Sequence, residues 1–125
     1  MADGLSVTAA DDMLTLLVST DALGAYVQLH TADPGSAGTT AVSSVTTREA
    51  QTWGSPSAGA VSASGTPTWS SWAGTNGEVD TDISHWTAAT SGTFGWSVTL
   101  SSSVTMDTGN TLELTADSIT LPTAS

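Results

Sequence analysis

The regular interruption of apolar runs by turn-forming residues limits the fold of this chain more than any other feature. Segments rich in valine, isoleucine, threonine and aromatic residues are separated by glycine, proline, asparagine or aspartate every ten residues or so. Serine and threonine make up about a third of the chain, while leucine, glutamate, lysine and arginine, which favour helices, are scarce. The sequence therefore predicts a mainly β protein with short strands.

Six to eight segments carry strand signals. They are residues 26–31, 46–53, 60–72, 79–88, 92–100, 104–106, 111–114 and 119–121. A break at Gly65 or Pro67 would divide the segment 60–72 into two strands. Their spacing favours an antiparallel β-sandwich, Ig-like or jelly-roll-like, in which two sheets pack face to face. A closed barrel is the structural alternative.

One short helix is expected near the N-terminus. Thr8 or Asp11 is a candidate cap, apolar residues follow over 13–18, and Gly24 marks the exit. A chain of 125 residues has room for one domain. We therefore expect a single domain over residues 1–125, in which 1–24 form an N-terminal segment and 25–125 the sandwich. Small polar residues at 32–45 predict an exposed loop.

Charge restricts the partners. The formal net charge is −11, and Arg48 is the one basic residue apart from two histidines. Such a chain repels nucleic acid and anionic membrane surfaces. No apolar run reaches the length of a membrane span, and the acidic start does not resemble a signal peptide. The chain has no cysteine, which excludes thiol chemistry and disulfides.

No motif indicates catalysis or a cofactor. His30 or His85 could be combined with Asp80 or Asp82 and one of many serines into a triad, but so serine-rich a sequence makes that combination uninformative. Nucleophile elbows, zinc-binding helices and phosphate loops are absent from the sequence. We expect a protein without enzymatic activity and without a cofactor.

Acidic residues alternate along one expected strand. Glu78, Asp80 and Asp82 would lie on one face, where their oxygens could bind calcium with help from a loop carbonyl. The pattern of an EF-hand loop is absent, so a solvated acidic face is the preferred interpretation. In that interpretation, residues 79–88 form a half-buried strand.

Five tryptophans and one arginine are the candidates for an interface. They are Arg48, Trp53, Trp69, Trp72, Trp86 and Trp96. Tryptophans on a sandwich can stack on sugar rings, but packing in the core or between subunits is the preferred role. The lone cation either forms an internal ion pair or anchors an interface.

Three segments resemble a known family. Residues 26–35, Tyr-Val-Gln-Leu-His-Thr-Ala-Asp-Pro-Gly, resemble the opening motif of small bacteriophage virion proteins, often labelled tail-fibre or minor tail proteins in actinobacterial phages. Residues 47–53 and 83–94 are similar to later segments of the same family. The resemblance implies a β-rich structural component of the virion without known catalysis.

The location in the virion is open at this stage. The chain has no heptad or collagen-like repeat for a fibre shaft, which favours a decoration protein that binds the major capsid protein, as a trimer, and stabilises the shell. The N-terminal segment, the 32–45 loop and the tryptophans are its expected contacts. The alternative is a tail-fibre or minor tail protein in host adsorption, with a cell-surface glycan as partner.

Overall fold

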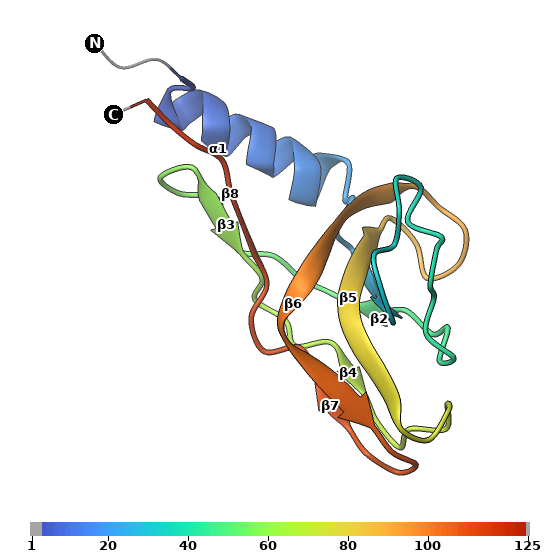
Figure 1. Cartoon of the computed structure of the whole chain (residues 1–125). Coiled ribbons are helices and arrows are strands. Elements are labelled where there is room, and N and C mark those ends of the chain that lie inside the picture. The colour runs from blue at the N-terminus through green and yellow to red at the C-terminus, as the bar shows by residue number, and fades with distance from the viewer. Residues whose placement is uncertain (1–3, 125) are drawn as a thin grey trace.

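A computed structural model describes residues 4–124 and is mainly β, as expected, with antiparallel strands and one short α-helix (Figure 1). The elements are α1 (Val7–Thr15), the π-helical turn η1 (Leu16–Thr20), β1 (Tyr26–His30), β2 (Glu49–Ala50), β3 (Ala60–Ser62), β4 (Thr68–Trp69), β5 (Glu78–Trp86), β6 (Phe94–Met106), β7 (Leu112–Glu113) and β8 (Ser118–Thr120). No helix among the described residues is long and apolar enough to cross a membrane.

Three antiparallel sheets make up the fold. The main sheet has the order β2-β1-β5-β6, so β1 and β5 are central and β6 forms an edge. Two pairs complete the structure, β3 with β8 and β4 with β7. Leu29 of β1 lies opposite Ile83 of β5, which aligns the apolar positions of the two central strands.

The larger core lies between the main sheet and the β4–β7 pair. Val27, Leu29 and Ile83 of the main sheet pack with Trp69 and Leu112, and Trp72 and Met106 complete the cluster. This face-to-face packing of two β layers is consistent with the expected sandwich.

A second, smaller core fixes the helix. Leu14 and Val18 pack against Val61 of β3, and five half-buried apolar residues surround them: Leu17, Trp53, Trp96, Ile119 and Leu121. Figure 1 shows α1 beside β3 and β8, at the end of the molecule where both chain termini lie. An isolated bridge between Leu5 and Thr123 joins those two ends.

The helix begins earlier than expected. Ser6 is the N-cap, and its hydroxyl accepts a hydrogen bond from the Ala9 amide at 3.1 Å, so the expectation of Thr8 or Asp11 was wrong. Asp11 instead accepts a bond from the Gly59 amide at 2.8 Å, which ties the helix to the turn before β3. Gly24 follows the helical segment as expected, where a Cβ would meet the Trp96 side chain at 2.5 Å.

The boundaries of β6 differ from the sequence pattern, whereas the division of 60–72 follows one of its alternatives. The expected strands 92–100 and 104–106 are one continuous strand, because β6 contains a bulge. Asp80 lies opposite Val104 and Asp82 opposite Thr99, so residues 100–103 face a single residue of β5. The segment 60–72 is divided into β3 and β4, and the break contains Gly65 and Pro67, the two positions considered from the sequence; proline has no amide proton for a strand ladder.

The expectation of a half-buried β5 with a solvated acidic face was also wrong. Asp80 is 0% and Asp82 8% exposed, whereas Val79 is 42% exposed. The reason is that residues 31–46 fold back over this face. Ser43 donates its amide to the Leu29 carbonyl, and its hydroxyl donates to the Glu78 carboxylate. The loop thus covers one face of the main sheet while the β4–β7 pair covers the other.

We predict that Leu14→Ala lowers the free energy of unfolding by about 2–5 kcal/mol, because it leaves a cavity in the smaller core. Chemical denaturation measures this change. Leu16→Ala is the matched control, since Leu16 is 50% exposed and its truncation should change stability by less than about 0.5 kcal/mol. Equal losses for the two variants would contradict the observed orientation of the helix.

Candidate functional site

The covered face of the main sheet contains a buried chain of hydrogen bonds. His30 Nδ1 donates to the Thr40 carbonyl at 2.8 Å, and burial lowers the pKa of His30, so the ring is neutral and Nε2 accepts. The Ser84 hydroxyl donates to Nε2 at 2.7 Å and accepts from Trp86 Nε1, also at 2.7 Å. His30 and Ser84 are both 0% exposed. His30 and Ser84 therefore connect β1, β5 and the loop at 31–46, and the Ser84 hydroxyl is not exposed to solvent.

Arg48 closes one end of this face. Its guanidinium lies 3.9 Å from the centre of the Trp86 ring, an arrangement that a cation–π attraction stabilises. Nη1 donates to the carbonyls of Ala88 at 2.9 Å and Ser91 at 2.7 Å. Among the described residues no carboxylate pairs with Arg48. The single arginine thus holds the 87–93 turn through carbonyl oxygens, which differs from the ion pair considered for it.

An acidic pair occupies the opposite end. Burial raises the pKa of Glu78, but bonds from the Ser43 hydroxyl, the Ser44 amide at 2.9 Å and Asp80 outweigh it and lower the pKa overall. Burial also raises the pKa of Asp80 to about 7, and the Glu78 charge adds to that shift. Both Asp80 carboxylate oxygens are buried without a partner other than that acidic neighbour. A proton on Asp80 is therefore favoured below neutral pH.

The acidic residues do not assemble a calcium site in this arrangement. Asp82 accepts from the Thr81 hydroxyl at 2.6 Å and the Thr99 hydroxyl at 2.9 Å, so its oxygens are already occupied. No three acidic, histidine or cysteine side chains within residues 4–124 converge closely enough to bind a metal. Calcium typically takes six to eight oxygen ligands.

The second histidine lies on the core side of the sheet. His85 Nε2 donates to Asp117 Oδ2 at 2.7 Å, and the Trp96 ring stacks on the imidazole with centroids 4.0 Å apart. The two histidines therefore belong to separate clusters, and neither joins Asp80 in a triad. Sequence reasoning missed Asp117 because it lies 32 positions from His85, and no local spacing links them.

The five tryptophans have different environments. Trp69, Trp72 and Trp86 are 3%, 2% and 6% exposed, so they present almost no ring surface to a partner. Trp53 and Trp96 are half-buried and contact each other, with ring centroids 5.6 Å apart. Trp53 also donates from its indole to the Gly24 carbonyl at 2.9 Å. Of the interface candidates, the structure leaves these two and Arg48 partly accessible.

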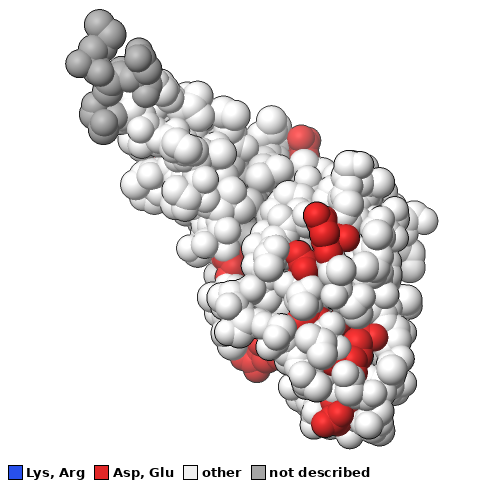
Figure 2. Space-filling model, viewed as in Figure 1, with Lys and Arg blue, Asp and Glu red and all other residues white. Residues whose placement is uncertain are grey.

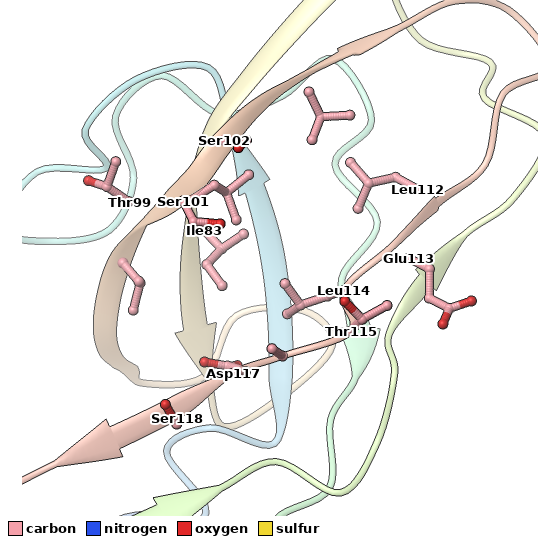
Figure 3. A pocket seen from close by; sticks show the side chains of 14 residues that line it. Ile83, Thr99, Ser101, Ser102, Leu112, Glu113, Leu114, Thr115, Asp117 and Ser118 are labelled. Carbon is pink, nitrogen blue, oxygen red and sulfur yellow. The ribbon is translucent and has the colours of Figure 1, made fainter.

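Two grooves lie on the surface. The first, here called the β6 groove, has a volume of about 500 Å³ and lies between β6 and residues 112–118 (Figure 3). The second, the Trp53 groove, measures about 560 Å³. No charged residue lines it; its walls are Thr15, Val18, Ser19, Ala25, Gln51, Thr52, Trp53, Gly54, Ser55 and Pro56.

Negative charge marks the exterior. Figure 2 shows carboxylates scattered over the visible face, with no lysine or arginine on it. The formal net charge of −11 already includes Arg48, so negative charge dominates the field around the chain. A polyanion would be repelled from such a surface.

Comparison with known protein families gives a match over nearly the whole chain. The family described as Podophage GP4 fiber I protein gp80 matches residues 3–122. No curated protein sequence matches the chain.

We predict that Arg48→Ala and Arg48→Lys both lower the free energy of unfolding, Arg48→Ala by about 2–4 kcal/mol. Each loses the planar group over Trp86 and the paired bonds to the carbonyls of the turn. Thermal unfolding measures the change, with the exposed Thr47→Ala as control. A loss for Arg48→Ala no larger than that for Thr47→Ala would contradict this role.

We predict that the free energy of unfolding of the Asp80→Asn variant increases relative to that of the wild type as the pH rises. The pKa of Asp80 is about 7 in the folded chain against 3.8 when exposed, so folding binds a proton between those values. The wild type should lose this stability from about pH 4 through pH 7, and the variant should not. Urea midpoints between pH 5 and 8 measure the difference. The control is Asp107→Asn, at an exposed turn, whose urea midpoint should change with pH in the same way as that of the wild type.

Proposed function

The chain belongs to the Podophage GP4 fiber I protein gp80 family, and from this premise we propose that it is a subunit of a virion fibre that takes part in host adsorption. The match over residues 3–122 carries the proposal, because it includes every element of the fold. A phage virion structural protein fits both locations considered from the sequence. The family description names a fibre, so it supports the tail alternative better than the trimeric capsid decoration that we expected.

The fold suits a repeated structural part. Both faces of the central strands β1 and β5 are covered, and polar side chains on one face are held by bonds to the loop that covers them. The hydrogen bonds of these buried polar groups specify one packing of the loop. A domain built in this way keeps the same surface when it assembles. The proposal includes two kinds of assembly. Copies of the chain form a homo-oligomer, and this homo-oligomer binds other virion proteins.

We assign contact with the host to the Trp53 groove. Trp69 and Trp72, the first candidates for stacking on sugar, are buried. The Trp53 groove combines one aromatic side chain with hydroxyl and amide groups and has no charge. Neutral sugars present apolar C–H faces and many hydroxyls, which suit an aromatic ring flanked by hydrogen-bonding groups. A cell-surface glycan is therefore the ligand class that we propose for it.

Cryo-electron microscopy of purified virions tests the location. We predict density for this domain in a fibre at the tail, and regular copies on the shell would overturn the fibre proposal in favour of decoration. The same virions carrying Ser55→Arg should adsorb to host cells on the order of tenfold more slowly, because the new side chain fills the groove. Ser70→Arg, at an exposed position outside the groove, is the control. Equal adsorption of both variants would remove the assignment to the groove.

A further inference from the structure

The outer edge of β6 is an open strand edge without charges or prolines. β6 has 13 residues and ends the main sheet, and within residues 4–124 the strand that pairs with it is β5. The segment Phe94–Met106 contains no charged residue and no proline, although the chain carries 12 acidic residues. Charges and prolines are what sheet edges use against pairing with other strands. The protective devices that β6 does carry are two bulges, one at 100–103 and one at 95–96.

The β6 groove lies along this edge. Figure 3 shows Ile83, Leu112 and Leu114 in the space between β6 and the 112–118 segment, with Ser101 and Ser102 on the β6 side. Leu100 and Val104 are also part of the lining. Val98 is 37% exposed at the same edge. The groove is therefore an open side of the larger core, with apolar side chains behind a strand edge.

Charge indicates what can cover this edge. Two acidic residues line the groove, and one of them, Asp117, accepts a bond from His85. The other, Glu113, directs its carboxylate away from Ile83 in Figure 3. A basic partner would find little to attract it here, whereas an uncharged strand of threonine, serine and valine fits. β6 of a second copy is such a strand, and the paired strands themselves would bring no like charges together.

We propose that two copies of the chain pair β6 with β6, antiparallel, across a twofold axis. The pairing joins two four-stranded sheets into one and brings the two β6 grooves together, so that the apolar side chains of both close against each other. The interface uses the same residues on both copies, as a twofold contact requires. This inference stands on the sheet edge and does not depend on the location of the protein in the virion.

Sedimentation equilibrium of the purified chain tests the proposal over a range of concentrations and salt. The wild type should form a dimer, and the dimer should strengthen with salt because screening reduces the repulsion between two highly acidic copies. The variant with Val98→Lys and Ser102→Lys should be monomeric. Ser70→Lys, at an exposed position of the chain outside this edge, should dimerise like wild type.

The lysine substitutions distinguish the effect of net charge on association from the effect of strand pairing. Each added lysine reduces the negative charge and by itself favours association, so a monomeric double variant reports the loss of strand pairing. Circular dichroism and thermal unfolding establish that the double variant is folded, and a misfolded one is replaced by Ser102→Lys alone. A wild type that stays monomeric at its highest soluble concentration overturns the proposal. A dimer or trimer that the β6 substitutions leave unchanged, or one that weakens with salt, does so as well.

Discussion

Buried polar groups must be hydrogen-bonded, and this requirement organises one whole side of the molecule. β1 and β5 place His30 and Ser84 on a face without solvent, and the carboxylate of Glu78 lies half-buried at its end. Leaving such groups unpaired costs about 1–3 kcal/mol each, so the residues after β1 fold back to supply partners. Thr40, Ser43 and Ser44 provide a carbonyl, a hydroxyl and an amide. The covering loop is thus determined by the polarity of the strand beneath it.

Much of the β framework could be predicted from local patterns. Strands at 26–31 and 79–88 and an N-terminal helix are present, because turn residues and strand-forming residues act over short distances. The alternation along β5 was misread because a period of two separates two faces but does not say which one meets water. The covering residues are distant in sequence, as with Ser43 and Glu78, which lie 35 positions apart.

The candidate site shows the same limit. Arg48 was singled out from the composition as the one cation, but two of its bonds go to the backbone carbonyls of Ala88 and Ser91, which no side-chain pattern reveals. The pairing of His85 with Asp117 depends on β5 and the segment before β8 meeting in space. Tryptophan count alone could not separate Trp72, deep in the core, from Trp53 on a groove.

The bridge between Leu5 and Thr123 sets how the domain responds to mechanical load. The two segments run parallel, and the Ala124 amide donates to the Leu5 carbonyl at 2.8 Å. A pull that separates these segments therefore loads this small contact and the helix layer first. The four-stranded sheet, with its long β5–β6 ladder, contains neither of these two segments. Tension applied at this end of the molecule would be absorbed by the smaller core before it reached the larger one.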